Sequence, residues 1–147
     1  MKTHAEQAYP NECCGLMLRS RSDQTAPLRL RKCTNAQDSY HRLDPVSFPR
    51  TARNAYFIDP KELLEIERER RSNDETIVAI YHSHCDAEAY FSEEDANRAK
   101  ADGEPLFPMA AYVVISVRSG RATGLKVFRW RRDLGRFLSD CGEIDRA

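Results

Sequence analysis

The chain has 147 residues, a length that fits one domain with a substantial core and is short for most two-domain enzymes. Its 23 basic and 23 acidic side chains cancel, so no net charge is available to hold nucleic acid or an anionic membrane. The longest apolar run, around residues 109–117, is too short to span a bilayer, and residues 1–12 lack the apolar stretch of a signal sequence. We therefore expect a cytoplasmic protein whose function resides in a local site, with neither nucleic acid nor a membrane as partner.

The cysteines favour a reducing compartment. They are odd in number and two are adjacent, which suits neither a paired disulfide framework nor a zinc ribbon with repeated C-x-x-C spacing. We expect reduced thiols at Cys13, Cys14, Cys33, Cys85 and Cys141.

The chain begins with a predicted short helix and two predicted strands. Residues 2–9 favour a helix, and a Pro-Asn break precedes an apolar strand over residues 13–19. Glu12 is therefore expected at the entrance of this strand. Residues 27–33 alternate in polarity, which predicts a second strand that pairs with the first.

A long connection and a helix are expected next. Residues 34–54 show no clean period and exceed the usual length of a structureless connection, which is typical of a functional loop. A short strand is predicted over residues 55–58. Asp59-Pro60-Lys61-Glu62 then indicates an N-cap, a first-turn proline and a capping-box acid for a helix that continues to about Arg71.

The second half of the chain brings two histidines to the end of a central strand. Residues 76–81 are apolar and β-branched, and they lead directly into His82-Ser83-His84. A helix is expected from Ser92 to about Ala101. Residues 109–117 and 122–130 predict a hairpin, while the region after Leu134 is left unassigned. These elements indicate an α/β (α+β) fold.

The histidines and one acid form a candidate metal site. His82 and His84 are two residues apart, so on a strand both imidazoles leave the same face, with α-carbons about 6.6 Å apart. Asp95 follows after a short excursion of the chain. Two imidazoles and one carboxylate are a zinc set that leaves the fourth position to water, as in catalytic sites. Glu12 is the candidate base for that water.

Each part of this site also has a purely structural interpretation. Ser92 followed by three acids is a helix N-terminus signal, with Ser92 as the N-cap. A His-x-His pair alone can end a strand as two solvated or hydrogen-bonded side chains. The combination of residues is what favours a metal.

The spacing resembles the signature of the JAMM/MPN metalloisopeptidase family, an upstream glutamate followed by H-x-H-x7-S-x2-D. Here the pattern is complete, with Glu12 upstream and then His82, His84, Ser92 and Asp95. The segment from Tyr9 to Leu16, YPNECCGL, is similar to the short bacterial branch. The resemblance implies one JAMM/MPN domain over residues 1–147. It further implies a single mixed, strongly curved β-sheet flanked by helices, in a cytidine-deaminase-like architecture.

The same resemblance implies a function and a role for each site residue. His82, His84 and Asp95 would bind one zinc ion, Glu12 would activate the water and protonate the leaving amine, and Ser92 would help to hold the oxyanion. The implied enzyme is a zinc metallopeptidase or isopeptidase that hydrolyses an amide bond. Its implied partner is the C-terminal tail of a ubiquitin-like or sulfur-carrier protein, which could add to a sheet edge as an extended strand.

The sequence departs from the family pattern in two places. Cys85 stands where many relatives have proline after the second histidine, which puts a potential thiolate beside the metal. Cys14 would share a strand face with Glu12, so thiols are expected to line the pocket, with ordinary buried cysteine as the alternative. The chain also begins inside a helix that relatives carry in fuller form, so we expect its N-terminal helix to be truncated relative to theirs.

Two other functions stay open, and the oligomeric state is left open with them. One is a non-catalytic MPN scaffold that only binds partners, although such members typically lack part of the ligand set. The other is a different small metallohydrolase, since residues 82–86 begin like the H-x-H-x-D-H motif of metallo-β-lactamase folds. Position 87, however, is alanine rather than histidine.

Overall fold

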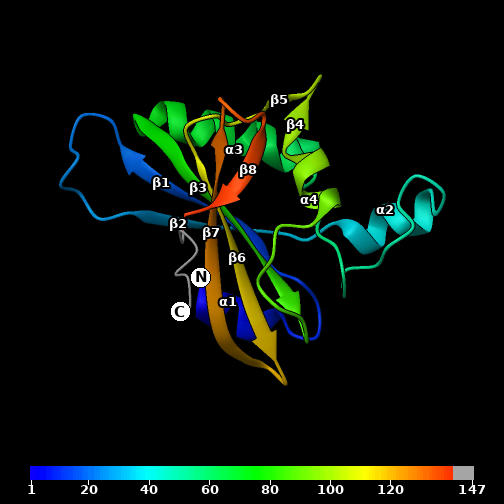
Figure 1. Ribbon diagram of the computed structural model, residues 1–147. Coiled ribbons are helices and arrows are strands. Elements are labelled where there is room, and N and C mark those ends of the chain that lie inside the picture. Colours follow the sequence, from blue (N-terminus) through cyan, green and yellow to red (C-terminus); the bar gives the residue numbers. More distant parts are fainter. Residues whose placement is uncertain (141–147) are drawn as a thin grey trace, which may run out of the picture.

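A six-stranded mixed sheet forms the centre of the computed structural model, which describes residues 1–140 (Figure 1). The strand order is β2-β1-β3-β6-β7-β8. The β3–β6 pair is parallel, and the other neighbouring pairs are antiparallel. The strands are β1 (Cys14–Ser20), β2 (Arg29–Cys33), β3 (Glu75–Cys85), β6 (Ala111–Arg118), β7 (Arg121–Arg131) and β8 (Arg136–Ser139).

Helices flank this sheet, which confirms the predicted fold class. Helix α1 contacts β6 and β7, whereas α3 contacts β3. The helices are α1 (Lys2–Ala8), α2 (Gln37–Leu43), α3 (Pro60–Ser72) and α4 (Glu93–Arg98), and a small separate hairpin is formed by β4 (Lys100–Ala101) and β5 (Glu104–Pro105). None of the helices within residues 1–140 is long and apolar enough to cross a membrane.

Both faces of the central strands are buried. On β3, Ile80 packs with Ile66 of α3, whereas its neighbour Tyr81 packs with Ala5 of α1. Because successive side chains of a strand point to opposite faces, each helix seals one side of the sheet. This double burial explains the nearly continuous apolar sequence of β3 and β6.

Most of the predicted elements are present. The N-terminal helix, the first two strands and their pairing, the central strand and the β6–β7 hairpin all form as expected. At the start of α3, the carboxylate of Asp59 accepts a hydrogen bond from the Lys61 N–H at 2.7 Å, and Pro60 occupies the first turn. The predicted cap of this helix is therefore confirmed.

The connection before α3 differs from the prediction. Residues 34–54 contain the short helix α2, and residues 55–58 form neither a helix nor a strand and do not pair with the sheet. The side chain of Asn35 takes the place of a partner strand, because its amide donates to the Ala55 carbonyl at 3.0 Å and its oxygen accepts from the Phe57 N–H at 3.1 Å. The strand predicted over residues 55–58 is therefore wrong.

Three further details differ. Glu62 does not close a capping box, because its carboxylate accepts from the Thr34 N–H at 3.1 Å and pairs with Arg31 at 3.3 Å. The helix that follows Ser92 ends at Arg98 instead of continuing to Ala101, since the chain turns into the β4–β5 hairpin. The unassigned region after Leu134 supplies β8, and the predicted free thiol of Cys141 lies outside the described residues.

Candidate metal centre

The end of β3 and the first turn of α4 bring three potential metal ligands together. His82 Nε2 lies 3.2 Å from His84 Nε2. Asp95 Oδ2 lies 3.4 Å from the first of these atoms and 3.5 Å from the second. In a tetrahedral zinc site with ligands about 2.05 Å from the ion, the ligand atoms are about 3.3 Å apart. The three side chains therefore match the spacing that a tetrahedral ion requires, and they could hold one.

The surroundings of the two histidines keep their Nε2 atoms directed at this centre. His84 Nδ1 lies 3.1 Å from the Glu88 carbonyl oxygen, which makes Nδ1 the donor and leaves a lone pair on Nε2. The ring of Tyr56 stacks on His82 with centroids 4.4 Å apart. Burial lowers the pKa of His82, so its imidazole stays neutral, which is the form that binds metals.

Ser92 acts as the predicted N-cap of α4 and also contacts the candidate ligand. The Asp95 N–H donates to Ser92 Oγ at 3.0 Å, and the Ser92 hydroxyl donates to Asp95 Oδ2 at 2.7 Å. Burial acts to raise the pKa of Asp95, but the neighbouring side chains of His82, His84 and Ser92 outweigh it and hold that pKa well below its usual range. The carboxylate is therefore ionised and oriented.

Strand pairing positions Glu12 next to the histidines. Cys14 of β1 lies opposite His82 of β3. Two residues further along each strand, this antiparallel register brings Glu12 opposite His84 and onto the same face. A hydrogen bond of 2.8 Å from the Cys13 N–H to Ser83 Oγ, on the neighbouring residues, holds the two segments together.

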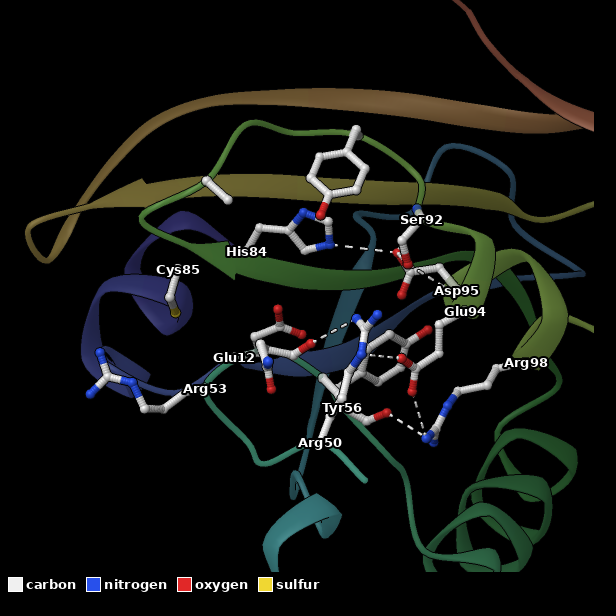
Figure 2. Close-up of a pocket in the computed structure, with 14 residues that line it drawn as sticks. Glu12, Arg50, Arg53, Tyr56, His84, Cys85, Ser92, Glu94, Asp95 and Arg98 are labelled. Carbon is white, nitrogen blue, oxygen red and sulfur yellow. Dashed lines mark hydrogen bonds and ion pairs between the residues drawn. The ribbon is translucent and has the colours of Figure 1, made fainter. Parts of the chain in front are cut away.

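The side chain of Glu12 lines a cavity of about 310 Å³ that also contains Asp95 and His84 (Figure 2). Glu12 is only 5% exposed. Burial raises its pKa to about 9, and the negative charges of Asp95 and Glu94 act in the same direction. A carboxyl in such an environment can hold a proton at neutral pH, which is a property of general acids.

The cysteines do not form the expected group in the cavity. Cys85 lines it, but burial and the charge of Glu12 raise the pKa of Cys85 to about 12, so it is a thiol rather than a thiolate. Cys14 belongs to the core with Ile66, and its Sγ lies 3.7 Å from the Thr34 carbonyl oxygen. Of the two candidate thiols, only Cys85 therefore reaches the cavity.

Comparison with known proteins identifies the family. The family described as "Prokaryotic homologs of the JAB domain" matches residues 1–133. This chain belongs to that family. The resemblance to JAMM/MPN proteins is thereby confirmed. The CysO-cysteine peptidase of Mycobacterium bovis is 32% identical to this JAB-family chain over 129 residues, which are 88% of this chain and 75% of the relative. The CysO-cysteine peptidase of Mycobacterium tuberculosis H37Rv matches with the same identity and coverage.

Solved structures share the fold of this JAB-family chain. A solution structure of a Desulfitobacterium hafniense protein matches with a TM-score of 0.64 and 26% identity, covering 95% of this chain and 82% of the other. A Salinibacter ruber protein matches with a TM-score of 0.55 and 27% identity, covering 95% and 81%.

An arginine–glutamate group in the cavity of this JAB-family chain was not predicted from its sequence. Glu94 Oε2 lies 2.8 Å from Arg50 Nε, and Glu94 Oε1 lies 2.9 Å from Arg98 Nη2. The guanidinium group of Arg98 also lies over the ring of Phe57, 5.2 Å from its centroid. The four-residue spacing of Glu94 and Arg98 on a helix is a signal that could have found this pair. Arg50 comes from the long connection, where the sequence has no comparable signal.

Proposed function

We propose that this chain is a zinc-dependent peptidase that hydrolyses an amide bond at the C-terminal tail of a sulfur-carrier or other ubiquitin-like protein. The observation that carries the proposal is the spacing of 3.2, 3.4 and 3.5 Å among His82 Nε2, His84 Nε2 and Asp95 Oδ2, next to the carboxyl of Glu12. Membership of the JAB family and relatives named CysO-cysteine peptidase support the reaction class and the carrier substrate.

In this proposal, His82, His84 and Asp95 hold the ion with two neutral nitrogens and one carboxylate oxygen. Bound zinc supplies Lewis acidity, a water molecule whose pKa falls to about 7, and positive charge that favours the ionised form of Glu12. The Glu12 carboxylate accepts a proton as the water attacks the substrate carbonyl. It then returns that proton to the nitrogen of the leaving amine. The buried position of Glu12 keeps the proton out of bulk water between these two steps.

Ser92 has two proposed roles. Its hydroxyl donates to Asp95 Oδ2 at 2.7 Å, which orients the metal ligand. A serine hydroxyl has one proton to donate. To stabilise the oxyanion, the Ser92 hydroxyl must therefore give up its hydrogen bond to Asp95 and donate to the oxyanion during the reaction. A donor in that position contributes about 10²- to 10³-fold to the rate.

We also place the protein in a reducing compartment such as the cytosol. Cys13, Cys14, Cys33 and Cys85 are free thiols. Cys14 and Cys33 lie directly opposite each other on β1 and β2, and they carry no disulfide. The odd number of cysteines in the sequence and the adjacent pair Cys13-Cys14 support a compartment that keeps thiols reduced.

A cleavage assay tests the proposed function. The zinc-loaded chain is incubated with a panel of sulfur-carrier proteins, each extended at its C-terminal glycine by one amide-linked cysteine. The masses of the products are then measured by mass spectrometry. We expect loss of the added residue, no reaction after chelation, and recovery when zinc is returned. A zinc-loaded preparation that leaves every carrier intact would contradict the proposal.

A further inference from the structure

The candidate active-site cavity contains three arginines, and two of them are engaged in internal contacts. Glu94 accepts from Arg50 at 2.8 Å and from Arg98 at 2.9 Å. Arg98 also donates to the Tyr56 carbonyl at 3.3 Å. These two guanidinium groups are therefore committed to the protein itself.

Arg53 is the third arginine, and it has no hydrogen-bond or ion-pair partner within residues 1–140. Its exposed side chain lines the cavity. Asp86 is close enough for its pKa to respond to Arg53, but its carboxylate accepts from the Tyr9 hydroxyl and from the Ser119 N–H, each at 3.0 Å. The N–H donors of Arg53 are consequently available to a ligand.

The position of Arg53 in the cavity indicates which part of a substrate it can bind. Figure 2 shows Arg53 near Cys85, with Arg98 at the other end beyond Glu94. Glu12 lies between Cys85 and Arg50 in this view, and all of these side chains line the cavity. The cavity therefore has one end where Arg50 and Arg98 share the carboxylate of Glu94, and another end, beyond Glu12 and Cys85, where the guanidinium group of Arg53 is unpaired.

The chemistry of amide hydrolysis assigns the leaving group to this second end. Hydrolysis breaks the C–N bond, adds hydroxyl to the carbonyl carbon and adds a proton to the nitrogen. Glu12 delivers that proton in the proposed function, so the leaving amine must lie on the Glu12 side. When a single amino acid leaves, its α-carboxylate is only two bonds from this nitrogen. A guanidinium group binds a carboxylate through two parallel, charge-assisted hydrogen bonds.

We propose that Arg53 binds the free α-carboxylate of a one-residue leaving group, so that this chain removes a single C-terminal amino acid instead of cutting within a longer segment. The inference rests on the proposed peptidase function. Arg53 would then be a specificity-determining residue that recognises the C-terminal carboxylate of the substrate.

Two substrates that differ only at the carboxylate test this role. One is a sulfur-carrier protein with one additional amide-linked cysteine as the free acid, and the other ends in the cysteine carboxamide. The wild type should favour the acid in kcat/KM by about 10- to 100-fold. Arg53→Met should bring the ratio close to one by lowering kcat/KM for the acid, and Arg53→Lys should retain part of the preference. Arg132→Met, at an exposed arginine outside the cavity, is the matched control.

A binding measurement separates recognition from turnover. In a Glu12→Gln background, which should bind substrate without cleaving it, calorimetry should show tighter binding of the acid, and Arg53→Met should remove the difference. Equal binding of acid and carboxamide, or an Arg53→Met variant that keeps the preference, would overturn the role of Arg53. Equal cleavage of both substrates by the wild type would also overturn it, yet would leave the peptidase function standing. Cleavage of neither substrate would instead refute the proposed function.

Discussion

Ser92 and Asp95 are joined at the start of α4 by hydrogen bonds that run in opposite directions. The Asp95 N–H donates to Ser92 Oγ at 3.0 Å, while the Ser92 hydroxyl and N–H donate to Asp95 Oδ2 at 2.7 and 2.9 Å. A single capping box therefore caps the N-terminus of α4 and fixes the carboxylate that lies next to the two histidines.

This relationship predicts that Ser92→Ala weakens both the helix and the metal site. Loss of the cap should lower the free energy of unfolding of the metal-free protein by about 1 kcal/mol, measured by urea denaturation. Loss of the bond to Asp95 should weaken zinc binding by about 10- to 100-fold, measured by competition with a fluorescent chelator. Ser92→Thr keeps the hydroxyl and serves as the control. Unchanged zinc affinity in Ser92→Ala would show that the serine does not orient the ligand.

A second prediction concerns the ion pair between Arg29 and Glu75, which join β2 to β3. Arg29 Nε and Nη2 donate to the two carboxylate oxygens of Glu75 at 2.8 and 2.6 Å, and these bonds lower the pKa of Glu75 from its usual 4.5. A lowered pKa in the folded state stabilises the protein above pH 4.5, and this stabilisation is lost as the pH falls through the folded-state pKa.

Glu75→Gln should therefore destabilise the protein at pH 7 and have little effect at acidic pH. Because the side chain of Arg29 is 37% exposed, solvent screening limits the expected loss to about 1 kcal/mol. Urea denaturation at pH 7 and pH 3 measures the difference, with Glu65→Gln on the exposed face of α3 as the control. A loss of the same size at both pH values would exclude the ionised pair as its cause.

A third prediction concerns Gly15 on β1. A Cβ atom at this position would collide with the Tyr81 hydroxyl and with the Arg31 carbonyl oxygen, and the latter belongs to the backbone and cannot turn away. Gly15→Ala should therefore lower the free energy of unfolding by about 1–3 kcal/mol. Gly124→Ala on β7 is the control, because a Cβ there would meet nothing within 4 Å. Equal stabilities of the two variants would refute the close packing at Gly15.

The features that could be predicted from the sequence depend on neighbouring residues. The central strand follows from the β-branched run before His82, and the cap of α4 follows from Ser92 and the acids after it. The H-x-H-x7-S-x2-D spacing predicts the three candidate metal ligands, because each of them lies on an element whose geometry is set locally. The strand register that brings Glu12 to His84 was available only through the family resemblance.

The features that escaped prediction depend on contacts between distant segments. The strand expected over residues 55–58 does not form, because the side chain of Asn35 satisfies its backbone from twenty or more positions away. Arg50 and Arg53 reach the cavity from the long connection, where neither periodicity nor a motif marks them. Single-sequence patterns carry no information on which side chain a folded loop will direct into a site.

A zinc peptidase that uses Glu12 as its general base is tested most directly by comparing zinc content and cleavage in the wild type and Glu12→Gln, on the same preparations. Both proteins should bind one zinc ion per chain, because Glu12 is not among the three candidate ligands. Cleavage of the extended carrier should fall by about 10²- to 10⁴-fold in Glu12→Gln. Cleavage by Glu12→Gln at the wild-type rate, or by wild-type protein that has been freed of zinc, would contradict this mechanism.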